Sequence, residues 1–306
     1  MFKSFLWKLL QKSTDGRKKL YILKDYNRGF FAMLRTVLEN IQYCESKGYC
    51  FIPDWTESRY VDQSRGYNAW DYYFEPISNL SLEEIEKSNY KVIKVDWSNS
   101  QRKMKRVRRN GKILSIREAY NYYLCSNIKI KKHITERMEL FYNQHMLGRQ
   151  VLGVHIRRTD KGSEAGFHDR SAYPIPDEQF IVNIDKYVKN NPECRVFVAT
   201  DSLSSFDRLK GIYKERVISW DSFRSPNENS IHGGIYDDGA VGVSNYKKGE
   251  DALIDCLLLS KCDFLIRGQS SLSNVSLCFN LRLKQLNLNW LYQGCQEDRF
   301  IENTIL

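Results

Sequence analysis

With 306 residues, the chain is too long for one small hydrophobic core, and its length predicts two domains. Because 42% of the residues are hydrophobic, the composition excludes a chain that is disordered throughout. The formal net charge of +10 favours anionic partners, such as nucleotides, phosphorylated sugars, nucleic acid or an acidic membrane surface.

The amino terminus is predicted to form a short basic amphipathic helix. Apolar residues recur there at helical spacing, with lysines between them: Phe2, Phe5, Leu6, Leu9 and Leu10, and Lys3, Lys8 and Lys12. Such a helix either docks on its own domain or lies on an anionic membrane surface, which would make the protein membrane-peripheral.

Residues 1–148 are predicted to form an α/β domain. Its expected strands are Tyr21–Leu23, Cys50–Pro53 and Lys91–Val95. Its expected helices start after Gly29, after the candidate cap Ser81 with Glu84 three residues on, and at Ile113 and Ile134. The aromatic stretch Asp54–Pro76 fits either a wall that stacks on acceptor sugars or an ordered loop packed on its own domain. The basic run Gln101–Lys112 fits either an anion-binding surface or a solvated face.

Strand and helix alternate in residues 149–306, which predicts a parallel sheet with helical crossovers, a Rossmann-like arrangement. The expected strands are Val151–Ile156, Arg195–Thr200 and Asp263–Ile266, and the expected helices are Asp177–Lys189, Ser204–Tyr213 and Glu250–Lys261. The glycine-rich segment Asn227–Lys248 interrupts this alternation and is expected to be a loop, either a lid or an inert surface excursion.

Cysteine usage and hydropathy bear on the cellular compartment. Eight cysteines are scattered without a C-x-x-C pair, which indicates buried free thiols rather than zinc ligands or a disulfide framework. No apolar run reaches the roughly 18 residues of a membrane-spanning helix, and no signal-peptide core is recognisable. These features predict a cytoplasmic protein.

Polar clusters follow each expected strand of the second domain. The first strand ends in His155-Ile-Arg-Arg-Thr-Asp160, the second in Ala199-Thr-Asp201, and the third in Arg267-Gly-Gln-Ser-Ser271 ahead of a helix. Ligands of open α/β sheets bind beyond these carboxyl ends. A guanidinium suits forked contacts with phosphate oxygens, and a serine-rich helix start offers hydroxyl and N–H groups. The pattern predicts a diphosphate site without a metal cage, centred on Arg157.

Other enzyme classes lack their sequence patterns here. The chain contains no Walker-type loop ending in Gly-Lys-Thr, no G-x-G-x-x-G after a strand and no His-Glu-x-x-His. Kinases, dehydrogenases and zinc hydrolases of these types are therefore disfavoured. No nucleic-acid-binding pattern is recognisable either, although the positive charge keeps a non-catalytic nucleotide- or nucleic-acid-binding protein as an alternative.

Three segments resemble the motifs of the fucosyltransferase superfamily. Val154-His-Ile-Arg-Arg-Thr-Asp-Lys161, with Glu164-Ala165 and Phe167-His168, is similar to the signature of the core and rhizobial nodulation fucosyltransferases. Ala199-Thr-Asp201 is similar to the second motif, and Leu258–Leu265 with Gln269-Ser-Ser271 is similar to the third. The resemblance covers about half of the chain, and the amino half matches only in organisation.

The resemblance implies an α/β fold of the GT-B type, with two Rossmann-like domains facing a central cleft. It also implies a GDP-fucose donor, inversion at the transferred sugar carbon, and no metal or cofactor. Arg157 would hold the β-phosphate, and Glu164 would deprotonate the acceptor hydroxyl with Lys161 beside it. The donor-binding residues implied or predicted in this way are His155, Arg157, Arg158, Thr200, Asp201, Asp255, Gln269, Ser270 and Ser271.

The physical chemistry agrees with those roles. Negative charge grows on the departing diphosphate, so a positioned guanidinium and helix N–H groups stabilise the transition state more than the ground state. The expected function is fucose transfer from GDP-fucose to a glycan acceptor, with residues 1–148 on the acceptor side and 149–306 binding the donor. The alternatives are a glycosyltransferase that uses another nucleotide sugar and the non-catalytic binding protein.

Overall fold

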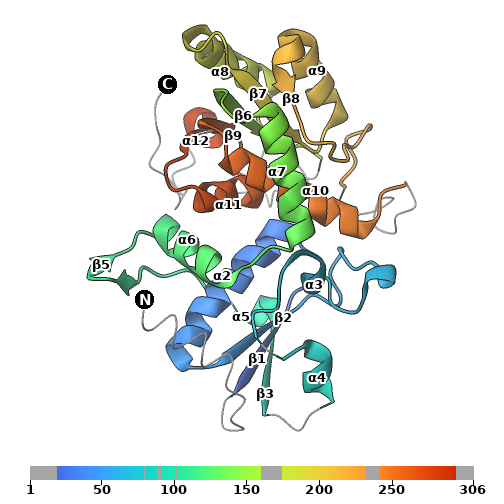
Figure 1. Cartoon of the computed structure of the whole chain (residues 1–306), viewed down its shortest axis with the longest axis vertical. Coiled ribbons are helices and arrows are strands. Elements are labelled where there is room, and N and C mark those ends of the chain that lie inside the picture. Colours follow the sequence, from blue (N-terminus) through green and yellow to red (C-terminus); the bar gives the residue numbers. More distant parts are fainter. Residues whose placement is uncertain are drawn as a thin grey trace. The chain divides into compact units, whose positions relative to one another are not determined.

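A computed structural model describes residues 19–78, 80–87, 91–100, 102–159, 174–231 and 242–293. The chain divides into two compact units, Met1–Lys132 and His133–Leu306 (Figure 1). This division falls earlier in the chain than the boundary expected after residue 148, because most of the helix α7 (Lys132–His145) groups with the second unit. The N-terminal helix expected at residues 2–12 lies outside the described residues, and no helix within them is long and apolar enough to cross a membrane.

The first unit is built on a three-stranded parallel sheet, in which β1 (Leu20–Lys24) lies between β2 (Cys50–Asp54) and β3 (Val92–Asp96). Each strand is a short β-prone run, which is why the sequence predicts all three. The helix α2 (Phe30–Lys47) follows β1 and buries the apolar residues expected from its periodicity. It ends at Gly48, whose φ of 67° is a left-handed value that favours glycine.

Shorter elements complete this unit. They are the 3-10 helix Gln63–Arg65, α3 (Trp70–Tyr73), α4 (Leu82–Glu86), α5 (Trp97–Ser100), the hairpin of β4 (Arg108–Arg109) and β5 (Lys112–Ile113), and α6 (Ile116–Asn127). The capping pattern is confirmed, because the Glu84 N–H donates to the Ser81 hydroxyl over 3.1 Å and the Ser81 N–H donates to the Glu84 carboxylate over 2.7 Å. Most described side chains of the basic run are exposed, as both a solvated face and an anion-binding surface require.

The aromatic stretch after β2 packs into the core of its own unit. The side chains of Trp55, Trp70 and Tyr73 are almost fully buried, and Trp55 and Trp70 meet edge to face at 5.2 Å between ring centroids. Tyr60 is also buried, and its hydroxyl accepts a hydrogen bond from the Phe30 N–H at the start of α2. Of the two interpretations of this stretch, the structure therefore supports the packed loop for these rings.

The second unit contains a five-stranded parallel sheet in the order β10-β9-β6-β7-β8. Its strands are β6 (Val151–Ile156), β7 (Arg195–Thr200), β8 (Val217–Ile218), β9 (Phe264–Arg267) and β10 (Lys284–Asn287). Its helices after α7 are α8 (Asp177–Asn190), α9 (Leu203–Tyr213), the 3-10 helix Lys214–Arg216, α10 (Asn245–Ser260), α11 (Ser271–Phe279) and α12 (Leu288–Gln293). The chain builds outward from β6 in both directions, so the strand order reverses between β6 and β9.

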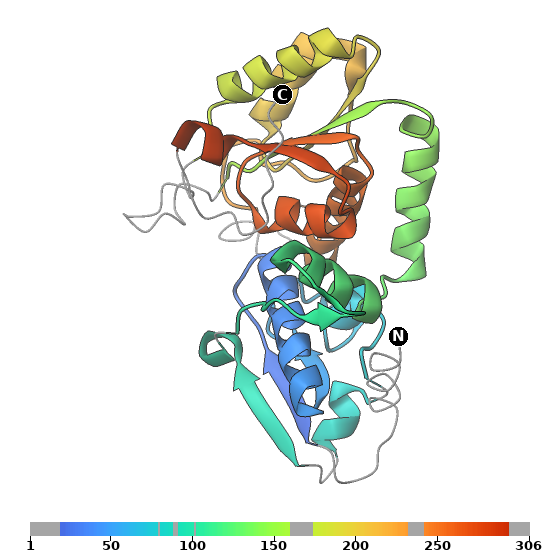
Figure 2. The same ribbon diagram turned by 90° about the vertical axis from the view of Figure 1, so that its left-hand side faces the viewer.

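Different helices pack against the two faces of this sheet. On one face Leu152, Val154 and Ile156 of β6 pack with apolar residues of α8 and α9. Figure 2 shows the ribbons of these two helices, in yellow tones, on the same side of the sheet. On the other face Gly153 lies against α10 and the turn after it, where a Cβ atom would come within 3.0 Å of the Cys262 sulfur. Glycine at this position therefore allows the close approach of the sheet to α10.

The cysteines agree with the expectation from the sequence. Seven lie in the part of the chain that the structure describes, all are free thiols, and all but Cys125 are buried.

Candidate active site

The carboxyl end of β6 places Arg157 beside the end of β7. Arg157 follows the fully buried strand directly, and its Nη1 donates to the Asp201 carboxylate at 2.7 Å. The two side chains are 17% and 6% exposed, so this is a largely buried ion pair. The pair uses one of the five N–H donors of the guanidinium.

Asp201 holds three consecutive residues of the turn after β6. Its carboxylate also accepts hydrogen bonds from the Arg158 N–H at 2.8 Å, from the Thr159 N–H at 3.3 Å and from the Thr159 hydroxyl at 2.9 Å. Four donors converge on this one side chain. These hydrogen bonds fix the turn that carries Arg157, and the donor-substrate contact that the sequence predicts for Asp201 stays a prediction.

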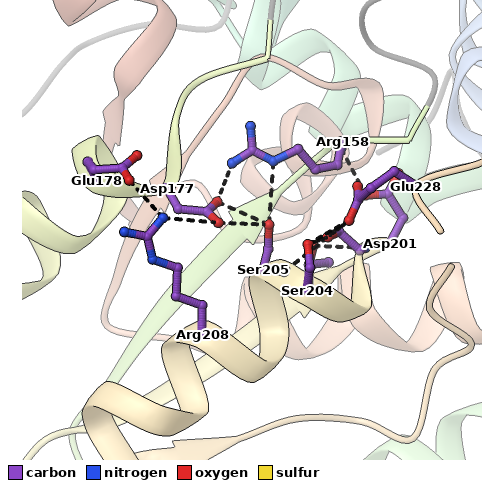
Figure 3. Close-up of polar contacts among 10 residues, drawn as sticks. Arg158, Asp177, Glu178, Asp201, Ser204, Ser205, Arg208 and Glu228 are labelled. Atoms are coloured by element: carbon purple, nitrogen blue, oxygen red, sulfur yellow. Dashed lines mark hydrogen bonds and ion pairs between the residues drawn. The ribbon is translucent and has the colours of Figure 1, made fainter. Parts of the chain in front are cut away.

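Arg158 ties the same turn to two helices (Figure 3). Its guanidinium pairs with Asp177 at the start of α8 and lies 3.4 Å from the Ser205 hydroxyl of α9. Ser205 in turn donates to Asp177 over 3.0 Å. These contacts hold the Arg158 guanidinium against α8 and α9 and not at the end of β9. We therefore expect Arg158 to support the turn.

A second carboxylate caps α9. Glu228 accepts hydrogen bonds from the hydroxyls of Ser202 and Ser204, and Ser202 is the N-cap residue of the helix (Figure 3). Negative charge at a helix N-terminus is favourable, because the unpaired N–H groups there carry partial positive charge. Thr200, another predicted donor-binding residue, is buried at the end of β7 and accepts a hydrogen bond from the Ser202 N–H over 3.2 Å.

The end of β9 lies next to the end of β6. His155 and Arg267 are register partners, and the Gly268 N–H donates to the His155 carbonyl over 3.3 Å. Neighbouring strands are about 4.8 Å apart, so Arg157 and Gln269 leave the same edge of the sheet on adjacent strands. Gln269 is fixed through its N–H, which donates to the Asn289 side chain over 2.6 Å.

The helix α11 starts at this edge. Ser270 is its N-cap, and the Ser270 hydroxyl accepts a hydrogen bond from the Leu272 N–H over 3.1 Å. Ser271 is the first helical residue, and its half-buried hydroxyl makes no hydrogen bond to any other residue that the structure describes. The helix start therefore presents a hydroxyl and a favourable dipole to an anion beyond the ends of β6 and β9.

Two large polar side chains are buried between these strands and the helices beneath them. His155 is 4% exposed and Arg267 is fully buried, with Arg267 Nη1 donating to Asn274 of α11 over 2.8 Å. The sequence predicts a role for His155 but not for Arg267. The signal was present in the sequence, because Arg267 ends an otherwise apolar strand.

Asp255 lies on α10 and is 6% exposed. Its Oδ2 accepts a hydrogen bond from the Ser222 hydroxyl at 2.7 Å, whereas Oδ1 is buried without a hydrogen-bond partner in the described parts of the chain. Burial raises the pKa of Asp255 to about 7, and the Ser222 hydrogen bond and the nearby Arg224 oppose that rise. Such a carboxylate is suited to accept hydrogen bonds from a bound ligand.

Comparison with known proteins identifies the family. A family model described as alpha-(1,6)-fucosyltransferase N- and catalytic domains matches residues 98–281. The chain belongs to this fucosyltransferase family. Nodulation protein Z of Sinorhizobium fredii is 26% identical over 156 residues, which are 49% of this chain and 45% of the relative. The match thus spans less than half of that relative's length.

Solved structures share the fold. NodZ alpha-1,6-fucosyltransferase co-crystallized with GDP aligns over 88% of this chain and 95% of its own, with 20% identity and a TM-score of 0.57. Fucosyltransferase NodZ from Bradyrhizobium aligns over 89% and 96%, with 20% identity and a TM-score of 0.55. POFUT1 in complex with GDP aligns over 90% and 99%, with 10% identity and a TM-score of 0.52. The predicted fold class, α/β and GT-B-like, is confirmed, and so is the family.

Most, but not all, of the predicted site residues lie in the part of the chain that the structure describes. The structure brings His155, Arg157, Gln269 and the start of α11 to one edge of the second sheet. The predicted base Glu164 and its neighbour Lys161 lie outside the described residues. No group of side chains able to hold a metal ion occurs among the residues that are described.

Proposed function

We propose that this chain transfers fucose from GDP-fucose to a glycan acceptor, either an oligosaccharide or a lipid-linked glycan, with inversion at the sugar carbon. The observation that carries the proposal is that β6, which leads into Arg157, and β9, which leads into the start of α11, are adjacent parallel strands at the point where the strand order of the second sheet reverses. Open α/β sheets bind ligands at such points. The similar NodZ structures were determined with GDP and with GDP-fucose, which supports this donor.

Arg157 and Ser271 would bind the diphosphate of the donor. A guanidinium is well matched to phosphate oxygens, and the Ser271 hydroxyl is available at a helix start. When the bond to fucose breaks, negative charge accumulates on the departing GDP. The Arg157 charge, held in place by Asp201, would stabilise that charge without reorganisation, so the reaction would need no metal ion or cofactor.

Asp255 would recognise guanine together with His155, which belongs to the same unit. Guanine offers an N1–H and a 2-amino group on one edge, and a carboxylate is an acceptor that suits both. The partnerless Oδ1 of Asp255 supports this assignment, because a buried carboxylate oxygen without a donor is costly until a ligand supplies one.

Glu164 would act as the general base on the acceptor hydroxyl, assisted by Lys161. General-base catalysis contributes typically about 10²- to 10⁴-fold, which gives the expected size of its loss. We assign the acceptor side to residues 1–148 and the donor side to residues 149–306. A cytoplasmic location is also proposed, on the basis of the free thiols, and contact of residues 2–12 with a membrane stays a prediction.

Two measurements test the function. In a thermal-shift screen of nucleoside diphosphates without added metal, GDP should stabilise the chain most; a preference for UDP would overturn the guanine assignment. Replacement of Glu164 by Gln should abolish fucose transfer and leave GDP binding intact, whereas Glu193→Gln, at an exposed position, should change neither. If the unmodified chain binds GDP but neither transfers nor hydrolyses any nucleotide sugar, it is a binding protein rather than an enzyme.

A further inference from the structure

Asp255 is held on one side only. Its Oδ2 accepts a hydrogen bond from Ser222, a residue 8% exposed, over 2.7 Å, and its Oδ1 has no partner within the described residues. The Ser222 hydroxyl thus fixes the rotation of the carboxylate about its last bond. The other oxygen, Oδ1, is a buried acceptor for which the described residues supply no donor.

Ser222 is itself held by residues on both sides. Asp251, one helical turn before Asp255, accepts hydrogen bonds from Trp220 Nε1 over 3.1 Å and from the Phe223 N–H over 3.3 Å. These contacts flank Ser222 in the chain and clamp its segment to α10. Further along, the Ser225 N–H donates to the Asp201 carbonyl over 2.8 Å, which ties the segment to the end of β7.

The charges around Asp255 come from the same two elements. Arg224, on the clamped segment, and Lys247, on α10, favour the ionised carboxylate, whereas Asp251 disfavours it. Arg224 is constrained in turn, because its guanidinium lies 4.2 Å from the Phe206 ring centroid and donates to the Trp220 and Ser222 carbonyls. The segment therefore supplies both an orienting hydroxyl and a fixed positive charge.

We propose that Ser222 is a positioning residue that sets nucleobase specificity, by holding Asp255 so that Oδ1 accepts a hydrogen bond from the 2-amino group of guanine. The step rests on the proposed function, in which Asp255 recognises the base. Hypoxanthine lacks the 2-amino group, and adenine presents an acceptor at N1 together with no 2-amino group. A fixed acceptor-only oxygen discriminates against both, whereas a carboxylate free to rotate could turn its oxygens away from that group.

The test is titration calorimetry of the full chain with GDP, IDP and ADP. The unmodified chain should bind in the order GDP, IDP, ADP. Ser222→Ala should weaken GDP binding about tenfold, the effect of one hydrogen bond to a charged group, and should bring GDP and IDP closer together. Ser222→Thr, which keeps the hydroxyl, should restore the preference. If Ser222→Ala does not fold, Ser222→Cys keeps the volume with a weak donor and should behave as the alanine variant does.

Ser204→Ala is the matched control. Ser204 also donates a serine hydroxyl to a carboxylate, that of Glu228 at 2.7 Å, and its replacement should leave the GDP to IDP ratio unchanged. The pH profile gives a second readout. Because the Ser222 hydrogen bond lowers the pKa of Asp255, its loss should move the rise in GDP affinity to higher pH.

Two results would overturn the role of Ser222 while GDP still binds the unmodified chain. One is an alanine variant with unchanged affinity and ratio; the other is an equal loss for GDP and IDP with an unshifted pH profile, as a merely structural role would give. A lack of GDP binding by the unmodified chain would instead remove the proposed function and this role with it.

Discussion

Replacing Asp201 by Asn should lower the stability of the second unit even when no ligand is bound. The substitution keeps the side-chain volume but removes the charge and turns one acceptor oxygen into an NH₂ donor. Four donors from Arg157, Arg158 and Thr159 now point at the Asp201 carboxylate. The amide cannot satisfy all of them, and Arg157 loses its counter-charge.

The size of the expected loss in stability follows from the burial of the Arg157–Asp201 ion pair. Breaking a buried ion pair by removing one partner costs about 3–5 kcal/mol. Arg157 keeps 17% of its side chain exposed, so water relieves part of its charge and the lower end, about 3 kcal/mol, applies. At about 2–4 °C per kcal/mol for a unit of this size, Tm should fall by about 6–12 °C.

Scanning calorimetry without ligand measures this change, and calorimetric titration with GDP follows it. Asp207→Asn serves as the control, because Asp207 is exposed on the neighbouring helix α9 and its replacement should shift Tm by no more than a degree or two. GDP affinity of the Asp201 variant should fall as well, since Arg157 loses its orientation. If Tm stays at the value of the unmodified chain while GDP affinity collapses, Asp201 contacts the donor directly and the supporting role is refuted.

Four further predictions concern Ser271, Asp255 and Gly153. Ser271→Ala should weaken GDP binding about tenfold but change stability by less than about 0.5 kcal/mol, because its hydroxyl has no hydrogen-bond partner in the described chain; calorimetry measures both. GDP binding should tighten as pH rises from 6 to 8, because the pKa of Asp255 is raised to about 7 and the ionised form accepts the base; Asp255→Asn should flatten this dependence in titrations at several pH values. Without ligand the sign is opposite: the folded carboxyl holds its proton more tightly than the unfolded one, so its contribution to stability should fall as pH rises from about 4 to about 7 in urea unfolding. Gly153→Ala should cost about 1–3 kcal/mol in the same assay, because the new Cβ would lie 3.0 Å from the Cys262 sulfur.

In the second unit, the strands that the sequence predicts are those with a continuous apolar run. β6 and β7 have the predicted bounds, whereas β8 and β10 do not stand out in the sequence. β8 has only two residues, and β10 reads Lys-Gln-Leu-Asn at the edge of the sheet, so neither carries a pattern of its own. They are strands because β7 and β9 offer them unpaired backbone groups.

The first residue of a helix is also difficult to predict from the sequence. α10 begins at Asn245, five positions before the expected start at Glu250. The added residues show no apolar periodicity, because they are mostly polar and include Gly249. The N-cap is Ser244, whose hydroxyl accepts a hydrogen bond from the Lys247 N–H over 3.2 Å. Propensity alone favours a loop for this turn. Contacts within the fold override that preference, since Tyr246 and Glu250 are buried and hydrogen-bonded to each other over 2.7 Å.

At the site, the sequence predicts which strand ends matter but not what each residue does there. Polar residues at strand ends look alike in a sequence, whether they bind a ligand or hold a loop. Asp201 is predicted to contact the donor from its place in the second motif at a strand end. Its observed partners, which the sequence does not indicate, come from a strand end more than forty residues earlier. Ser222 lies in a segment without periodicity, so its hydrogen bond to Asp255 could not be anticipated.

The ends of β6 and β7 differ from the end of β9 in their balance of charged residues. At the ends of β6 and β7 each arginine has an acid: Arg157 pairs with Asp201, and Arg158 pairs with Asp177. The stretch from Gly268 to Asn274 after β9 contains no acidic residue, so the start of α11 has no carboxylate of its own to satisfy its dipole. An anion arriving at this edge would meet repulsion from Asp201 on one side and open N–H and hydroxyl donors on the other. The diphosphate should therefore lie toward α11, with Arg157 reaching it from the adjacent strand, and Ser271 should matter more for binding than any residue of the β7 end.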